Sequence, residues 1–379
     1  MDYKQELTAL AERGNLRSLP ETAHCGKWVM AEGQRLLNLS SNDYLGLAAD
    51  TALRDRFMAT LREEDFLFSA SSSRLLTGNF TIYRKLENRL AELFHAESAL
   101  VFSSGYHMNT GILPAVSDAQ TLILADKLVH ASLIDGIRLS AARCIRYRHQ
   151  DYEQLEALVC KHQGAYERLI VVTESIFSMD GDVADLPRLV ALKKQYPNVW
   201  LYVDEAHAVG VRGAGGLGVA EEQGCMGDID FLCGTFGKAM ASVGAYVVCR
   251  KEIREYLVNK MRTFIFTTAL PPVNIAWTCF LLEHLADWNG RRERLATLSA
   301  RLREEMAVRG IPCVSASHIV PLVVGESEQA AMKAAELRRK GFYVLPVRPP
   351  TVPEGTSRLR FSLRADVTDV ELDLLLHSI

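Results

Sequence analysis

The sequence predicts an α/β protein, with a large domain built on a mostly parallel sheet and a smaller α+β domain after it. Two observations lead to this fold class. From about residue 80, short segments of continuous apolar character alternate with segments of helical periodicity, which is typical of parallel sheets buried on both faces. Polar residues directly follow several of these apolar segments, at the position where open α/β sheets bind ligands.

The first predicted elements precede this sheet. Residues 2–13 carry apolar positions at helical spacing, and Gly14-Asn15 ends the pattern, so we expect a helix there. A short β pattern covers residues 28–30 and 36–39, and residues 40–47 are predicted as a loop.

The strands of the large sheet follow a predicted helix over residues 82–94. Helical segments lie between most of these strands, so the expected connections are those of a parallel sheet. The predicted strands are 99–102, 122–125, 144–147, 169–172, 201–203 and 231–233.

Pro271-Pro272 is the predicted boundary before the small domain. We therefore expect an N-terminal segment (1–45), a large cofactor-binding domain (46–270) and a small C-terminal domain (271–379). A long helical stretch is expected first in the small domain. The elements predicted there are helical residues 273–309, a strand at 320–324, a helix at 329–340, strands at 343–346 and 358–362, and a last helix from 369.

Composition narrows the class of protein. The chain has 379 residues, of which 48% are hydrophobic and 23% charged, as in globular proteins with a large core. The formal net charge of −3 gives no reason to expect a nucleic acid partner. No stretch approaches the roughly 18 apolar residues of a membrane span, and the charged first residues lack the apolar core of a signal peptide. We expect a cytoplasmic protein.

The cysteines support the same compartment. The eight cysteines contain no C-x-x-C pair and lie mostly in apolar contexts such as Val159-Cys160 and Val248-Cys249. Reduced, buried thiols of a cytosolic enzyme are the expected state. We expect no bound metal.

The most informative motifs are Thr235-Phe236-Gly237-Lys238 and Asp204-Glu205-Ala206-His207. A lysine amine can hold an aldehyde cofactor as a Schiff base. Pyridoxal phosphate (PLP) needs that amine and also a carboxylate, which keeps the pyridine nitrogen protonated so that the ring acts as an electron sink. Asp204 directly follows the predicted strand 201–203. The hydroxyl of Thr235 is a candidate for the phosphate, and His207 for the same ring.

Two other interpretations of these motifs are weaker. Asp-Glu-Ala-His also occurs in nucleotide-driven helicases, but these need the phosphate loop G-x-x-x-x-G-K-[ST]. Here Gly237-Lys238 is followed by Ala239, and no other Gly-Lys pair in the chain fits. Lys238 considered alone would be a surface lysine, but the glycines around it and the apolar stretch 243–248 argue against a solvated helix face.

Together with other motifs, this pair resembles the α-oxoamine synthases, PLP enzymes of fold type I. The resemblance covers nearly the whole chain in the right order. Its further motifs are Ser40-Ser41-Asn42-Asp43-Tyr44-Leu45-Gly46, Ser103-Ser104-Gly105-Tyr106, His130-Ala131-Ser132, Phe177-Ser178-Met179-Asp180-Gly181-Asp182 and Phe266-Thr267-Thr268-Ala269-Leu270-Pro271-Pro272.

The resemblance implies a PLP site. Lys238 is then both the imine partner and the base that removes the Cα proton of an amino acid, and Asp204 holds the pyridinium. His130 is expected to stack on the ring, and His207 to bond its phenolic oxygen. The other implied cofactor contacts are the hydroxyls of Ser178 and Thr235, the backbone of Gly105 and Tyr106 near the phosphate, and Thr267 and Thr268 reaching the phosphate of a partner subunit in a homodimer.

The C-terminal run Val347-Arg348-Pro349-Pro350-Thr351-Val352-Pro353 resembles one branch of the family. That branch joins L-alanine to a pimeloyl thioester carried on coenzyme A or on an acyl carrier protein. Arg348 is the best candidate for the amino-acid carboxylate, since a guanidinium can bind it with two parallel hydrogen bonds. Arg17, Thr351 and Asn42 are substrate contacts by resemblance.

One loop departs from the family pattern. Relatives are glycine-rich where this chain has Ser69-Ala70-Ser71-Ser72-Ser73. Serine lacks the easy access of glycine to φ > 0, so we expect a stiffer loop or a different path. The resemblance places this loop near the dimer interface and the acyl substrate.

Two alternatives to the alanine branch stay open. Glycine C-acetyltransferase or another α-oxoamine synthase would use the same PLP site with other substrates. An inactive regulatory subunit on the same fold would be no enzyme at all. The presence of Lys238, Asp204 and His207 argues against the second alternative.

Overall fold

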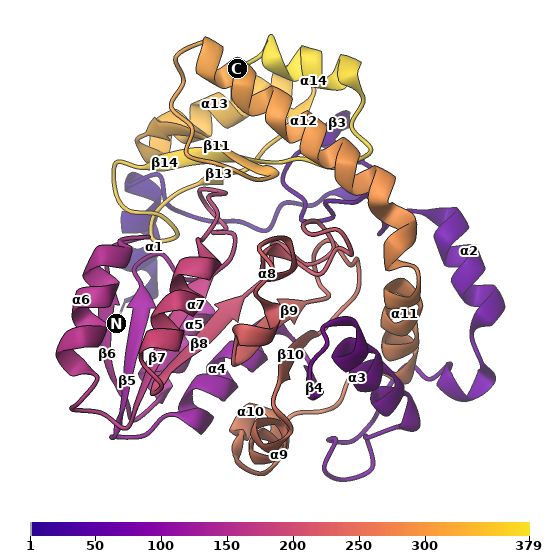
Figure 1. The fold of residues 1–379 in the computed structure, drawn as a ribbon. Helices are drawn as coiled ribbons and strands as arrows, with labels where there is room; N and C mark the ends of the chain where they lie inside the picture. The colour runs from indigo at the N-terminus through magenta and orange to yellow at the C-terminus, as the bar shows by residue number, and fades with distance from the viewer. Residues whose placement is uncertain (1) are drawn as a thin grey trace. The chain divides into compact units, whose positions relative to one another are not determined.

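The computed structural model describes residues 2–379, which divide into two compact units (Figure 1). Unit 1 comprises the N-terminal residues as far as Asp50, the short segment Ser178–Asp182, and Gly290–Ile379. Unit 2 comprises Thr51–Phe177 and Val183–Asn289. Residues 271–289 belong to unit 2 in this division, whereas we predicted them in the small C-terminal domain. The domain boundaries stay a prediction.

Unit 2 contains a seven-stranded sheet in the order β4-β10-β9-β8-β7-β5-β6. Strands β5 to β9 pair in parallel, whereas β10 runs antiparallel to both β4 and β9. The predicted largely parallel sheet is therefore confirmed. Its strands are β4 (Ser98–Phe102), β5 (Thr121–Asp126), β6 (Arg143–Tyr147), β7 (Arg168–Glu174), β8 (Val199–Asp204), β9 (Phe231–Thr235) and β10 (Ala245–Cys249).

Helices connect these strands. The long helix α4 packs on α5, α3 packs on β4, and α7 packs on β8. The helices of unit 2 are α2 (Thr51–Thr60), α3 (Thr81–Leu93), α4 (Gly105–Val116), α5 (Ala131–Leu139), α6 (Tyr152–His162), α7 (Leu186–Gln195), α8 (Val219–Glu222), α9 (Lys251–Lys260), α10 (Arg262–Ile265) and α11 (Pro272–Glu283), with short 3₁₀ turns at Glu63–Asp65, Met226–Asp228 and Leu285–Trp288.

Unit 1 contains two smaller sheets. One has the order β1-β2-β3-β12, and the other is antiparallel in the order β11-β14-β13. Their strands are β1 (Ala23–Cys25), β2 (Trp28–Ala31), β3 (Gln34–Asn38), β11 (Ile319–Gly325), β12 (Phe342–Tyr343), β13 (Pro346–Val347) and β14 (Ser357–Ser362), with helices α1 (Tyr3–Glu12), α12 (Asn289–Val308), α13 (Ser327–Arg339) and α14 (Asp369–Leu376).

Most predicted elements occur close to their expected positions, with three differences. The apolar stretch 243–248 forms most of strand β10, which was not among the predicted strands. The predicted helical stretch 273–309 is interrupted by a 3₁₀ turn at Leu285–Trp288. The predicted strand 343–346 is two separate pairs, because β12 pairs with β3 and β13 pairs with β14.

The thiols differ in part from expectation. Cys249 is buried as predicted, but Cys160 is exposed on α6. All eight cysteines are free. The apolar residues around position 160 predicted a buried thiol, but Cys160 lies on the solvent-exposed face of α6.

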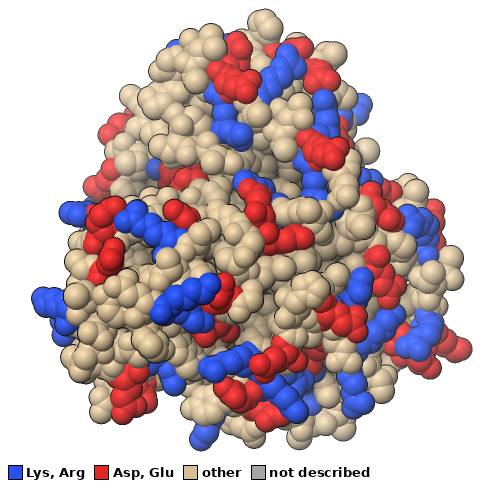
Figure 2. All heavy atoms as spheres, in the orientation of Figure 1, with Lys and Arg blue, Asp and Glu red and all other residues tan. Residues whose placement is uncertain are grey.

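Charges of both signs are interspersed over the face shown in Figure 2. Among residues 2–379, no helix combines the length and the apolar character needed to cross a membrane. Within the same range, no group of three or more His, Cys, Asp or Glu side chains is placed to hold a metal ion.

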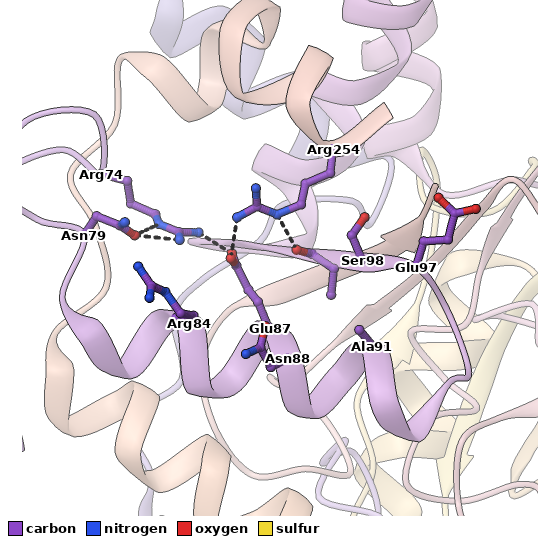
Figure 3. A pocket seen from close by; sticks show the side chains of 10 residues that line it. Arg74, Asn79, Arg84, Glu87, Asn88, Ala91, Glu97, Ser98 and Arg254 are labelled. Atoms are coloured by element: carbon purple, nitrogen blue, oxygen red, sulfur yellow. Dashed lines mark hydrogen bonds and ion pairs between the residues drawn. The ribbon is translucent and has the colours of Figure 1, made fainter. Parts of the chain in front are cut away.

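A buried carboxylate ties α3 to its neighbours in unit 2. Glu87 pairs with Arg74 at 2.5 Å and with Arg254 at 2.8 Å, and its side chain is only 6% exposed. Figure 3 shows both guanidinium groups directed at this carboxylate beside a cavity of about 420 Å³. Arg74 also donates to Asn79 at 2.7 Å, so this ion pair anchors the loop that follows Ser73.

We predict that Glu87→Gln lowers the free energy of unfolding by about 3 kcal/mol, because breaking a buried ion pair leaves uncompensated charge. Urea unfolding of the purified protein measures the change. Glu92→Gln on the same helix is the matched control, since Glu92 is 66% exposed in its pair with Arg89 and should cost under about 1 kcal/mol. Equal losses in both variants would contradict this account of Glu87.

Candidate active site

The turn after β9 carries Lys238. Two backbone hydrogen bonds close this turn. The Phe236 N–H donates to the Gly244 carbonyl at 2.9 Å, and the Ser242 N–H donates to the Phe236 carbonyl at 2.8 Å. Lys238 Nζ lies 3.0 Å from His207 Nε2. The turn therefore holds the amine against the imidazole that follows β8.

Two features fix the conformation of this turn. Ala241 adopts a left-handed backbone conformation with φ 44°, which costs a non-glycine residue about 1–2 kcal/mol. The indole N–H of Trp277 donates to the Ala241 carbonyl at 3.0 Å. The hydroxyl of Thr235 donates to Gly244 O at 2.9 Å, so its hydrogen closes the turn. Its predicted phosphate contact stays a prediction.

Asp204 is the last residue of β8 and is 5% exposed. Parallel pairing sets Glu174 of β7 directly beside it. Its Oδ1 accepts the Ala206 N–H at 2.9 Å, and its Oδ2 accepts the side-chain N–H of Asn109 at 2.8 Å. The strand register thus puts a buried carboxylate at the edge of the sheet that also carries the lysine turn.

His130 is the N-cap of helix α5, where its ring accepts the Ser132 N–H. Its Nδ1 lies 2.8 Å from Ser132 Oγ. Burial lowers the pKa of His130, while the charge of Asp204 raises it and that of Lys238 lowers it further. A largely neutral ring with Nδ1 accepting carries its hydrogen on Nε2, a tautomer assigned from this hydrogen-bond network.

Two further carboxylates are buried at the same strand ends. Glu174 is 3% exposed and accepts the His130 N–H at 2.5 Å. Burial, followed by the charge of Asp204, raises the pKa of Glu174 well above its usual range. Glu205 is fully buried and accepts hydrogen bonds from Ser175 Oγ at 2.5 Å and from the backbone of Ala220 at 2.7 Å.

Helix α4 begins at Gly105, directly after β4. Ser104 caps it by accepting the His107 N–H at 3.2 Å. A Cβ added at Gly105 would meet nothing within 4 Å, so the approach to this backbone is open. First-turn N–H groups of a helix bind anions well, which suits the predicted phosphate contact of Gly105 and Tyr106.

The serine-rich loop lies beside the predicted threonine pair. The N–H of Ala269 donates to Ser72 O at 2.9 Å, and Ser103 Oγ donates to Thr268 O at 3.3 Å. Ser71 adopts φ 49°, so a serine here takes the left-handed conformation for which glycine is the usual residue. A serine thus holds a positive φ in this loop, and the expected difference in path from the relatives stays a prediction.

The remaining predicted residues belong to unit 1. Arg17 donates to Thr351 Oγ1 at 2.9 Å across 334 positions of sequence, so the structure brings these two together. Asn42 accepts from Tyr44 at 3.0 Å, and Arg348 donates to the Gly14 carbonyl. Ser178 is part of the short unit 1 segment.

Several polar residues at these sites were given no role in the prediction from sequence. In unit 2, most of them form hydrogen bonds with Asp204 or His130 or with a residue bonded to these. In unit 1, Arg360 donates to both Ser178 O and Asn42 Oδ1. The segment after Tyr106 also carries His107 and Thr110, so residue type did not set Asn109 apart. The missed residues are Asn109, Ser132, Tyr202, Glu174, Glu205 and Arg360.

The donor set of unit 2 fits PLP. It provides an amine for the aldehyde, a buried carboxylate for the ring nitrogen, two imidazoles for the ring and an open helix N-terminus for the phosphate. An α/β sheet with these groups at its carboxyl edge defines a PLP-dependent enzyme of fold type I.

The comparisons with known proteins agree with this class. The chain belongs to the class I and II aminotransferase family, whose model matches residues 34–379. It is 58% identical over 371 residues to a putative 8-amino-7-oxononanoate synthase of Glaesserella parasuis, covering 98% of this chain and 97% of the relative. It is 56% identical over 381 residues to the 8-amino-7-oxononanoate synthase of Haemophilus ducreyi, covering 99% and 98%.

Solved structures place the chain in the same group. A serine palmitoyltransferase of S. paucimobilis with bound PLP and myriocin superposes with a TM-score of 0.90 at 30% identity, covering 100% of this chain and 97% of that one. An 8-amino-7-oxononanoate synthase of Francisella tularensis gives 0.77 at 28% identity, covering 90% and 96%. The predicted resemblance to α-oxoamine synthases and the predicted PLP cofactor are confirmed.

Burial raises the pKa of Glu205 from 4.5 to about 7, against hydrogen bonds that lower it. The folded protein therefore binds this proton more tightly than the unfolded chain does. The stability from this group is complete below about pH 4.5 and is lost as the pH rises through about 7. We predict that Glu205→Gln flattens the fall in the free energy of unfolding between about pH 5 and pH 8 by roughly 2–3 kcal/mol. Urea unfolding at both pH values measures it, and an unchanged pH slope would contradict the assignment.

Proposed function

We propose that this chain catalyses the decarboxylative condensation of L-alanine with a pimeloyl thioester in biotin biosynthesis. A carbon–carbon bond forms between the alanine α carbon and the thioester carbonyl carbon. The thiol carrier and CO₂ leave, and 8-amino-7-oxononanoate is the product. The observation that carries the proposal is 54–58% identity over nearly the full length of curated relatives that bear this name, together with the Lys238 site.

Residues of unit 2 are proposed to hold the cofactor. Lys238 supplies the amine, and Asp204 accepts the N–H of the ring. His207 lies 3.0 Å from that amine and bonds the phenolic oxygen, while His130 stacks on the ring. Gly105 and Tyr106 bind the phosphate through the first turn of α4. PLP, when bound, supplies an electron sink for negative charge at the alanine α carbon.

Proton transfer at the alanine α carbon is the task of Lys238. Its amine removes the proton before the carbon–carbon bond forms and returns a proton after CO₂ is lost. The turn that carries it is closed at both ends by backbone hydrogen bonds and clamped by Trp277. These bonds fix the backbone from which the amine extends.

Unit 1 is proposed to supply the substrate contacts. Arg348 binds the amino-acid carboxylate, and Arg17, Thr351 and Asn42 contact the substrates. The hydrogen bond between Arg17 and Thr351 supports their acting together. Ser178 adds a hydroxyl to the cofactor, and Arg360, which donates to Asn42 at 3.2 Å, joins this set.

A homodimer in the cytoplasm is the proposed state of the protein. Large apolar side chains are exposed in two segments that backbone hydrogen bonds join, from Val273 to Leu67 and from Ala269 to Ser72. They are Phe66, Phe68, Leu76 and Phe266, with Phe266 71% exposed. Exposed apolar surface of this kind marks interfaces. Thr267 and Thr268 would then reach the phosphate of the partner subunit. Eight free thiols suit a reducing compartment.

We predict that Lys238→Ala lowers the exchange of the alanine α hydrogen in heavy water by at least about 100-fold, because a general base contributes 10²–10⁴-fold. Proton NMR of alanine incubated with the PLP-loaded protein measures the rate without any thioester. Asp204→Asn should also slow exchange, since an amide cannot hold the ring proton. Exchange within tenfold of wild type in the Lys238 variant would remove this residue from its proposed role.

The proposed substrates can be tested by competition. A pimeloyl chain buries several methylenes at about 0.8 kcal/mol each, so we predict that it outcompetes acetyl-coenzyme A by more than about a hundredfold in kcat/KM. Alanine should exceed glycine by about 10–200-fold, the leverage of one methyl group. Mass spectrometry of the products identifies each condensation. Preference for glycine with acetyl-coenzyme A would instead indicate a glycine C-acetyltransferase.

A further inference from the structure

Asn109 lies inside helix α4 and is 1% exposed. Its side chain makes three hydrogen bonds. The carbonyl accepts from Tyr202 Oη at 2.7 Å, and the amide nitrogen donates to Asp204 Oδ2 at 2.8 Å and to Ser132 Oγ at 2.9 Å. Both amide hydrogens and the carbonyl are thus used.

The directions of these bonds follow from chemistry. The Asp204 carboxylate accepts and does not donate, so the Asn109 N–H groups face Asp204 and Ser132. The Asn109 oxygen then faces Tyr202, whose hydroxyl donates to it. Because Ser132 accepts from Asn109, its own hydrogen is available for Nδ1 of His130 at 2.8 Å.

The Asn109 amide is therefore linked to two residues that have different proposed roles toward PLP. Asp204 is proposed to hold the ring nitrogen of PLP, and His130 is proposed to stack on the ring. Asp204 ends strand β8, whereas His130 follows β5. From helix α4, Asn109 contacts Asp204 directly and His130 by way of Ser132. A rotation of this amide by half a turn would direct its oxygen at the Asp204 carboxylate, which is electrostatically unfavourable.

We propose that Asn109 is a positioning residue that sets the orientation of Asp204 directly. By holding Ser132 Oγ, it also adds a second donor to Nδ1 of His130, which already accepts the Ser132 N–H at 3.2 Å. Tyr202 supports this orientation by donating to the amide oxygen. The proposal rests on the proposed roles of Asp204 and His130, and no catalytic contact is assigned to Asn109 itself. Outer partners of this kind typically change affinity or activity by about 10–100-fold when removed.

Three variants separate the arms of this network. Asn109→Leu removes the bonds to both Asp204 and Ser132 at similar volume. Ser132→Ala removes the hydroxyl that donates to His130 and keeps the backbone N–H bond, and Tyr202→Phe removes the donor to the amide oxygen. Asn198→Leu is the control. Its amide also donates twice, to Gln163 O at 2.9 Å and Tyr166 O at 3.1 Å, but it precedes β8, whereas Asp204 ends that strand.

Four readouts are measured on each variant: the PLP dissociation constant, alanine α-hydrogen exchange, thermal unfolding, and ¹⁵N NMR of labelled histidine in the PLP-free protein. We expect Asn109→Leu to weaken PLP binding and to slow exchange by about 10–100-fold each. Ser132→Ala should shift the His130 ring nitrogen signals and leave PLP binding within about threefold of wild type. Tyr202→Phe should give intermediate losses in both.

The double variant Asn109→Leu/Ser132→Ala tests the proposed order. Because Asn109 acts on His130 through Ser132, the second change should add little to the first, whereas independent sites would add. Full additivity would overturn the proposed coupling.

The NMR signals of the PLP-free protein do not depend on which substrates the enzyme uses. Failure of the proposed condensation would therefore leave this test intact. A merely structural asparagine would lower thermal stability and leave PLP binding, exchange and histidine signals unchanged, as expected for Asn198→Leu. That pattern in Asn109→Leu, or unshifted His130 signals in Ser132→Ala, would overturn the proposal.

Discussion

Three buried carboxylates at the ends of two neighbouring strands impose the main constraint on unit 2. Glu174, Asp204 and Glu205 are at most 5% exposed, and burying an ion costs several kcal/mol unless it is compensated. Burial raises the pKa of Glu174 well above its usual range and that of Glu205 to about 7. All three accept hydrogen bonds: Glu174 from the His130 backbone, Glu205 from Ser175 and the Ala220 backbone, and Asp204 from Asn109 and Ala206. Asp204 is the one of the three that is proposed to face the ring nitrogen of PLP.

The surrounding fold follows from this arrangement. Parallel pairing of β7 with β8 aligns Glu174 with Asp204, and pairing of β8 with β9 brings the lysine turn to the same edge. The turn is held by backbone bonds and by the indole of Trp277, at the cost of a left-handed Ala241. Local strain of this kind is typical of functional sites that the surrounding structure over-determines.

The sequence located most of the sheet, since the apolar runs predicted six of the seven strands of unit 2. It also selected Lys238 and His207, whose nitrogen atoms the structure places 3.0 Å apart, while the roles of Lys238, His207 and Asp204 stay a prediction. The hydrogen-bond partners were not predictable. Asn109 meets Tyr202 and Asp204 only in the folded chain, across 93 and 95 positions of sequence, and no spacing in the sequence records these contacts. Likewise, Arg17 and Thr351 are joined across 334 positions.

The central claim is that Lys238 is the residue on which PLP is bound. The most direct measurement is borohydride reduction of the PLP-loaded protein, followed by proteolysis and peptide mass spectrometry. The account predicts a pyridoxyl group on the peptide that contains Lys238 and on no other lysine peptide at comparable yield. A label spread over several lysines, or placed on a different one, would contradict it.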